Sequence, residues 1–119
     1  EKALEAGASG IVVSNHGGRV LDHCPATAEV LPEIVDAVGG KLTIFVDGAI
    51  RSGMDMFKAL ALGADAVLIG RPFVTTIYGG GEEGVQLYVQ KLKAELADTM
   101  RMCGAHSLAE IKRSMLFGF

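Results

Sequence analysis

Short runs of aliphatic and β-branched residues alternate along this sequence with longer segments in which apolar positions recur at helical spacing. The runs cover residues 9–14, 43–46 and 66–69, and a glycine separates each run from the helical segment before it. Continuous apolar runs of this length are typical of strands buried on both faces of a parallel sheet. The pattern therefore predicts three parallel strands, each preceded by a helix.

The helical segments carry recognisable start and stop signals. The helix before the first strand ends at Gly7. The second covers 32–38, with Pro32 at the first helical position, where its missing N–H is no loss. The third begins after Ser52, whose hydroxyl is a typical helix cap, and ends at Gly63. These signals predict the same helix–glycine–strand unit three times.

After the third strand the repeating unit stops. Three glycines at 79–81 lead into a predicted long helix, and Ser107 with Glu110 forms a capping-box pattern that predicts a short final helix. Alternating helices and strands of this length indicate an α/β fold with crossover connections, here three βα units plus C-terminal helices. The long helix has one apolar stripe, formed by Val85, Val89, Leu92, Leu96 and Met100.

The first residues predict an incomplete domain. Residue 1 is not Met, and the chain begins at the end of a helix that leads directly into a buried strand. We therefore expect residues 1–119 to form one partial domain whose N-terminal portion is absent.

Composition narrows the classes of partner. The 119 residues are 50% hydrophobic and 21% charged, with a net charge of −3, which excludes general disorder and gives no basic surface for nucleic acid. No apolar run approaches the roughly 20 residues that span a membrane. Cys24 and Cys103 lack the spacing of a metal site, so we expect reduced thiols, no bound metal and a cytoplasmic location.

The loops after the three strands carry the candidate chemistry, because ligands of parallel α/β folds bind at the carboxyl ends of strands. The second and third loops combine glycines with Arg51 and Arg71. Arginine binds phosphate through two parallel hydrogen bonds, and the helix that begins near Ser52 directs its positive end to the same place. These two loops predict a phosphate site.

The first loop carries His16, with Arg19 three residues later. Histidine exchanges protons near neutral pH, and arginine suits a carboxylate. A histidine that only forms structural hydrogen bonds at a turn is the alternative, but the neighbouring phosphate loops favour a base that faces a phosphorylated cofactor. Asp22 either caps this loop or orients Arg19.

Several motifs together resemble the FMN-dependent α-hydroxy-acid oxidase and dehydrogenase family. They are SNHGGR at 14–19 followed by Leu21-Asp22, DGAIR at 47–51, KALALGA at 58–64 and GRP at 70–72. The resemblance implies the C-terminal part of a (βα)8 TIM barrel, with strands six to eight, and FMN as cofactor. It also implies oxidation of a small 2-hydroxy acid, such as lactate or glycolate, to the 2-oxo acid.

The resemblance assigns roles to individual residues. His16 is the implied base, Arg19 binds the substrate carboxylate and Ser14 contacts the flavin ring. Ala49 departs from the family pattern, which usually has a second glycine there. The residues implied to hold the ribityl chain and phosphate of FMN are Asp47, Gly48, Ala49, Ile50, Arg51, Gly70 and Arg71.

Two alternative functions remain open. Another FMN barrel enzyme, such as a type 2 isopentenyl-diphosphate isomerase, has similar phosphate segments but lacks the histidine loop. A non-catalytic phosphate-binding fragment is the second alternative. Residues 1–119 alone are expected to be inactive, and an incomplete barrel with an open edge is expected to associate with another chain, as a homo-oligomer.

Overall fold

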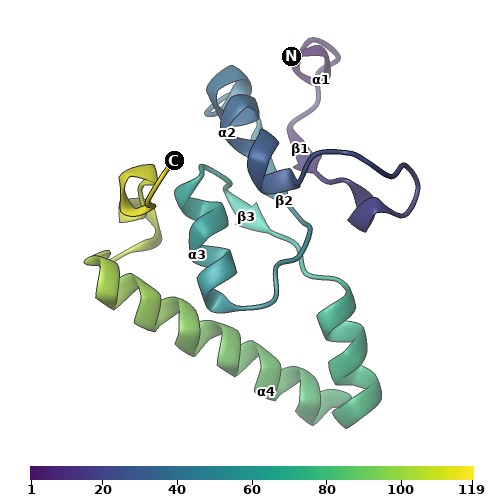
Figure 1. The fold of residues 1–119 in the computed structure, drawn as a ribbon, viewed down its shortest axis with the longest axis vertical. Coiled ribbons are helices and arrows are strands. Elements are labelled where there is room, and N and C mark those ends of the chain that lie inside the picture. The colour runs from purple at the N-terminus through teal and green to yellow at the C-terminus, as the bar shows by residue number, and fades with distance from the viewer.

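The computed structural model describes all residues, Glu1–Phe119, as a small parallel sheet with helices packed on one side (Figure 1). Two short 3₁₀ turns, Leu108–Glu110 and Arg113–Met115, follow the last helix, and another, His16–Gly18, follows the first strand. The other elements are α1 (Lys2–Glu5), β1 (Gly10–Val13), α2 (Thr27–Val38), β2 (Thr43–Val46), α3 (Gly53–Ala61), β3 (Ala66–Val67) and α4 (Arg71–Cys103).

The three strands are parallel and lie in the order β1-β2-β3. Gly10 pairs with Thr43, and Val46 pairs with Val67, so chain order and spatial order coincide. This arrangement confirms the predicted succession of βα units. The third strand is shorter than predicted, because the chain turns after Leu68, whose N–H still donates to Val46 at 2.9 Å.

The core lies between the sheet and the helices α2 and α3. Ile44 and Val46 of β2 point toward these helices and are almost fully buried, whereas Phe45 points to the other face and is only half-buried. A second cluster attaches the C-terminal turns to α3. The main cluster comprises Val13, Leu31, Val38, Leu42, Ile44, Val46, Ala59, Leu62 and Ala64, and the second Phe57, Ala61, Ala105 and Ile111.

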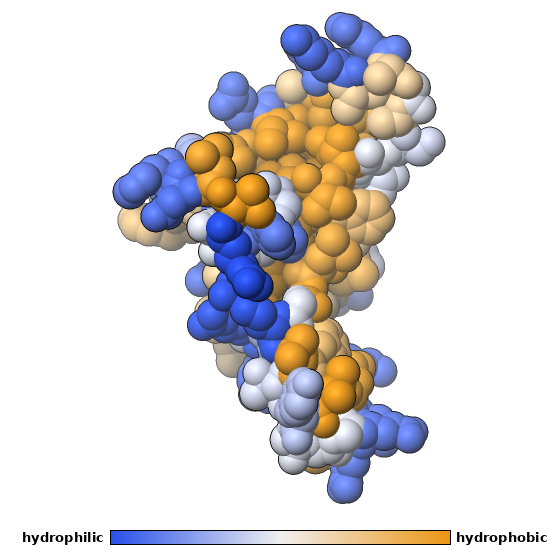
Figure 2. Space-filling view, turned by 90° about the vertical axis from the view of Figure 1, so that its right-hand side faces the viewer, coloured by the Kyte–Doolittle hydropathy of each residue, from blue (hydrophilic) through white to orange (hydrophobic).

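The expectation that the strands are buried on both faces is wrong, because one face of the sheet is open to solvent. Val12 of β1 is 51% exposed, and Leu68 after β3 is also exposed. Figure 2 shows the result as a broad apolar surface beside a strip of strongly hydrophilic side chains. The reason is that the helices that follow the strands pack on one face of the sheet, and nothing in this chain covers the other.

The second helix begins earlier than predicted. It starts at Thr27, so Pro32 lies within the helix instead of at its first position. The carboxylate of Glu29 accepts a hydrogen bond from the backbone N–H of Ala26 at 2.9 Å. Ala26 has no side-chain acceptor, so this cap is one-sided. It starts the helix in a segment without a clear apolar period, which is why the sequence pattern placed the start too late.

Helix α4 differs most from the prediction. It begins at Arg71, and Gly81, with φ 55° and ψ −139°, divides it into two helical parts (Figure 1). The glycines at 79–81 therefore interrupt a helix instead of preceding one. Within the apolar stripe Leu92 is buried but Val89 is exposed, because Tyr88 packs inward in its place.

The final helix is reduced to the 3₁₀ turn Leu108–Glu110. The Ser107 hydroxyl makes no capping hydrogen bond, and the Glu110 carboxylate accepts instead from the N–H of His106 at 2.9 Å. No helix of the chain combines the length and the apolar character needed to cross a membrane.

Candidate active site

The three strand ends meet at one open cavity of about 230 Å³. The loops after β1, β2 and β3 all contribute to its wall, as expected for parallel strands. Gly17, Leu68 and Pro72 also line it, although they were not predicted. The structure brings together every predicted site residue except Ser14, namely His16, Arg19, Asp47, Gly48, Ala49, Ile50, Arg51, Gly70 and Arg71.

Ser14 does not line the cavity. Its hydroxyl oxygen accepts a hydrogen bond from the backbone N–H of His16 at 3.1 Å. In this structure Ser14 shapes the turn that carries His16, and its contact with a flavin ring stays a prediction.

The turn that carries His16 is conformationally demanding. His16 has φ 54°, in the left-handed region, and Gly17 and Gly18 follow with φ 63° and 73°. For a residue with a side chain this conformation costs about 1 kcal/mol, and such strain is concentrated at functional sites. His16 is therefore held in place by its surroundings.

Asn15 is a positioning residue that the sequence analysis missed. Its side-chain oxygen accepts from the N–H of Gly17 at 3.0 Å, and its amide donates to the carbonyl of Pro25 at 3.3 Å. The first bond is an Asx turn, for which the Asn-x-Gly pattern was the available signal. Asp22 accepts from the N–H of His23 at 2.8 Å, so it caps the loop.

The Asp47 carboxylate has an unused hydrogen-bonding atom. Its Oδ1 is buried and has no partner. The backbone around it is fixed, because the hydroxyl of buried Thr27 donates to the Asp47 carbonyl at 2.7 Å. Buried polar atoms nearly always have partners, so an orphaned carboxylate oxygen beside a cavity suits a ligand that donates a hydrogen bond.

Glycine at two positions allows close packing of the loops. A Cβ atom on Gly17 would lie 2.8 Å from a guanidinium nitrogen of Arg71, and one on Gly48 would lie 2.9 Å from the hydroxyl of Thr27. The loops after β1 and β3 therefore touch at Gly17 and Arg71. Ala49 keeps the left-handed conformation, with φ 58°, in spite of its methyl group.

The N-terminus of α3, which was predicted to face an anion, is already capped in part by carboxylates of this chain. The N–H groups of Arg51 and Ser52 both donate to the Asp55 carboxylate at 3.1 Å, and the N–H of Gly53 donates to Glu95 at 2.8 Å. These carboxylates already occupy the donors. Helix α4, in contrast, begins at Arg71 without any side-chain cap.

The cavity is positively charged. Arg19, Arg51 and Arg71 line it, and none of them forms an ion pair within the chain. Asp47 is the only acidic residue on its wall. Three unpaired guanidinium groups favour a ligand with more than one anionic group, such as a phosphate together with a carboxylate. No group of three His, Cys, Asp or Glu side chains suited to a metal ion is present.

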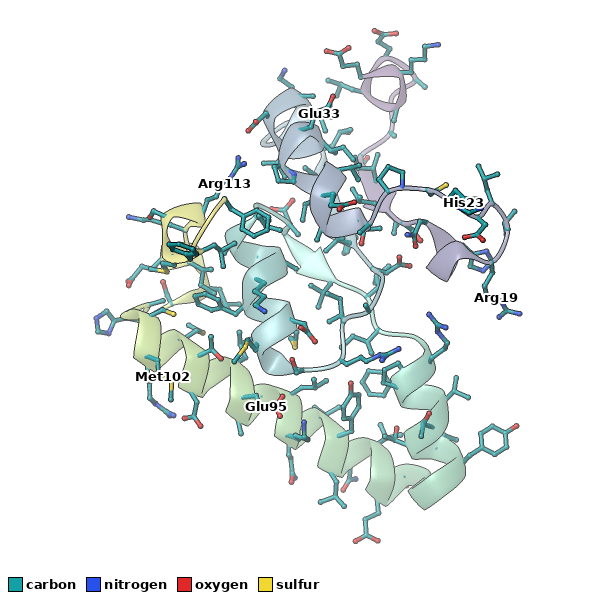
Figure 3. The ribbon with its side chains drawn as sticks, viewed as in Figure 1. Arg19, His23, Glu33, Glu95, Met102 and Arg113 are labelled. Atoms are coloured by element: carbon teal, nitrogen blue, oxygen red, sulfur yellow. The ribbon has the colours of Figure 1, made fainter.

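Two titratable groups on α4 behind the cavity have shifted pKa values. Burial raises the pKa of Tyr88 above 10.0, and its hydroxyl donates a hydrogen bond to the Arg51 carbonyl. The hydrogen bond from Lys91, assisted by the N–H of Gly53, lowers the pKa of Glu95 below 4.5. Figure 3 places Glu95 on the side of α4 that faces α3.

Comparison with known proteins identifies the family to which this site belongs. The profile of the FMN-dependent dehydrogenase family matches residues 1–117. The chain belongs to this family. It is 50% identical over 113 residues to a peroxisomal (S)-2-hydroxyacid oxidase of Arabidopsis thaliana. It is 48% identical over 118 residues to an L-lactate oxidase of Roseobacter sp. (strain GAI101).

These matches cover most of this chain but a minority of each relative. The chain is covered to 95% and 99%, whereas it spans only 31% and 32% of the two relatives. A crystal structure of mandelate oxidase superposes with a TM-score of 0.91 at 48% identity, covering 94% of this chain and 34% of that one. The likeness of this FMN-dependent dehydrogenase segment to mandelate oxidase confirms the predicted fold class, part of a (βα)8 barrel.

Proposed function

We propose that residues 1–119 supply the base, the carboxylate-binding arginine and part of the FMN site of an enzyme that oxidises a small 2-hydroxy acid to the 2-oxo acid. One observation carries the proposal. His16, three unpaired arginines and Asp47, whose Oδ1 atom is buried without a partner, line a single cavity. The names of the related hydroxy-acid and lactate oxidases support it.

The cavity residues fit FMN. Arg51 and Arg71 suit its phosphate, and the Asp47 Oδ1 atom suits a hydroxyl of its ribityl chain. A crystal structure of a related mandelate oxidase variant holds an FMN adduct. When bound, FMN would accept the two electrons that the substrate loses.

The remaining chemistry falls to the loop after β1. Arg19 would hold the substrate carboxylate through two parallel N–H···O bonds, which fixes the 2-carbon relative to the loop. His16 would accept one of the two hydrogens that the substrate loses, as a proton at an imidazole nitrogen, and the other would leave with the two electrons that pass to the flavin. The left-handed backbone of His16, fixed by Ser14 and Asn15, would keep the ring directed at that proton.

The experiment that tests this function uses the full-length protein that contains these residues. Purified protein with bound flavin is mixed without oxygen with lactate, glycolate or mandelate, and the flavin absorbance near the visible maximum is followed. Bleaching by at least one of these acids is expected. Propionate, which has the carboxylate but no hydroxyl, is the control and leaves the absorbance unchanged.

The outcomes separate the competing functions. Bound flavin that no small 2-hydroxy acid bleaches would contradict the proposal and favour another FMN barrel enzyme, such as an isomerase. A protein that binds no flavin would favour a non-catalytic phosphate-binding role.

We also propose that residues 1–119 alone do not turn over and associate with themselves through the exposed face of the sheet. Apolar side chains such as Val12 and Leu68 are open to solvent on that face. Sedimentation of the isolated chain should show self-association, and titration with FMN should show weak binding. Nanomolar FMN affinity of the isolated chain would contradict the expectation of an incomplete site.

A further inference from the structure

Tyr88 contacts both turns that carry the phosphate-site arginines. Its hydroxyl donates to the backbone carbonyl of Arg51 at 2.9 Å. Its ring packs edge-on against Phe73, with ring centroids 5.2 Å apart and planes at 72°. Phe73 lies in the first turn of α4, two residues after Arg71. One side chain therefore joins the turn after β2 to the turn after β3.

Tyr88 lies outside the cavity. It does not line the wall, and it comes from the part of α4 beyond the break at Gly81. Its position follows from the fold of α4, because that break turns the second part of the helix back across the start of α3 (Figure 1).

A second contact holds α4 against the start of α3. The Glu95 carboxylate accepts the N–H of Gly53 at 2.8 Å and is also paired with Lys91. Gly53 has no side chain to separate the helices, since a Cβ there would lie 2.6 Å from the carbonyl oxygen of Leu92. The carbonyl of Arg51 and the N–H of Gly53 are thus both bound by α4, on either side of Ser52.

The backbone positions of Arg51 and Arg71 determine where their guanidinium groups lie, because neither side chain forms an ion pair that would fix it. The position of each guanidinium depends on where its Cα lies, and two-point binding of a phosphate tolerates little displacement.

We propose that Tyr88 is a positioning residue for the phosphate-binding arginines, holding the turns of Arg51 and Arg71 at the separation that a phosphate monoester requires. The inference rests on the proposed function, because it concerns the same FMN site. It assigns a role in cofactor affinity to a side chain that touches neither cofactor nor substrate.

The test compares two flavins in the full-length protein after its flavin has been removed. Riboflavin lacks the phosphate but keeps the ring and the ribityl chain. In the Tyr88→Phe variant the ring contact with Phe73 is kept and only the hydroxyl is lost. The Kd for FMN should rise about 3- to 10-fold, the effect of one net hydrogen bond, whereas the Kd for riboflavin should change less than about twofold.

Two further variants sharpen the comparison. Phe73→Leu keeps the hydrogen bond of the Tyr88 hydroxyl and removes the ring contact. It should also raise the Kd for FMN more than the Kd for riboflavin. Tyr78→Phe is the matched control, because Tyr78 lies in the part of α4 before Gly81, is 90% exposed and makes no side-chain hydrogen bond. It should leave both affinities unchanged. With FMN at saturation, kcat of Tyr88→Phe should stay within about twofold of the wild type, because the hydrogen bond and ring contact of Tyr88 are with Arg51 and Phe73 and not with the loop of His16.

The outcomes distinguish this inference from the proposed function. Equal weakening of FMN and riboflavin by Tyr88→Phe would show a purely structural role and overturn the inference, as would unchanged FMN affinity. Both results leave the proposed function intact. Wild-type protein that binds no FMN would refute the proposed function, and the inference with it.

Discussion

Replacement of Gly53 by alanine should separate α3 from α4. Gly53 is the first residue of α3, and its φ is not in the left-handed region, so alanine fits the backbone conformation itself. The obstacle is α4. An added Cβ would lie 2.6 Å from both the carbonyl oxygen of Leu92 and the Cβ of Glu95, and closer still to the backbone nitrogen of Leu96.

These contacts set the size of the effect. Non-bonded atoms normally lie about 3.5–4.0 Å apart, so the helices must move by about 1 Å, and helix backbone cannot rotate away as a side chain can. Such overpacking costs about 1–3 kcal/mol. The movement also weakens the hydrogen bond of Gly53 to Glu95, while the better helix propensity of alanine returns up to about 1 kcal/mol. The last two contributions roughly offset each other, so we expect a net loss of about 1–3 kcal/mol.

The assay is urea denaturation of the full-length apoprotein, followed by circular dichroism. Gly79→Ala is the matched control, because Gly79 lies inside α4 and a Cβ there would meet no atom within 4 Å. It should be neutral or up to about 1 kcal/mol stabilising. The steric argument is refuted if Gly53→Ala changes the unfolding free energy no more than Gly79→Ala does.

Three further variants test the site and its support. His16→Gln should abolish flavin reduction while FMN stays bound. Full turnover by this variant would show that His16 is not the base. Ala49→Gly should raise stability by about 0.5–1 kcal/mol in a thermal melt, because glycine adopts φ 58° without strain, and a lower Tm would contradict this. Glu95→Gln should lower Tm at about pH 7, and the difference should vanish as pH falls below 4.5, since a carboxylate with a lowered pKa stabilises the fold only while it is ionised. A Tm difference that does not decrease as pH falls below 4.5 would exclude that cause.

Local signals in the sequence predicted the elements that local interactions determine. The Ser52 hydroxyl accepts from the N–H of Asp55 at 3.1 Å, as its capping pattern predicted, and the three strands follow the predicted glycines. The cavity residues were also found, because parallel strands must end on the same side. Local signals failed at the start of α2 and at the glycines within α4. The residues that position the site were missed for another reason, because their contacts depend on distant partners.

Tyr88, Thr27 and Asn15 illustrate this limit. Each is bound to a residue at least ten positions away, Arg51, Asp47 and Pro25 respectively. Nothing in the neighbouring sequence specifies these contacts, and periodicity placed Val89 inward where the fold uses Tyr88. Residues that position a site were therefore less predictable than residues that line it.

The concentration of Arg19, Arg51 and Arg71 around one cavity also has a consequence for folding. Three arginines that form no ion pair, beside one aspartate, repel one another, and the repulsion opposes closure of the three loops on which they lie. An anion that binds all three loops removes this repulsion and stabilises the native state by mass action. Multivalent anions such as phosphate should therefore protect the apoprotein against proteolysis. The anionic part of a bound ligand would then stabilise the fold in addition to its part in binding.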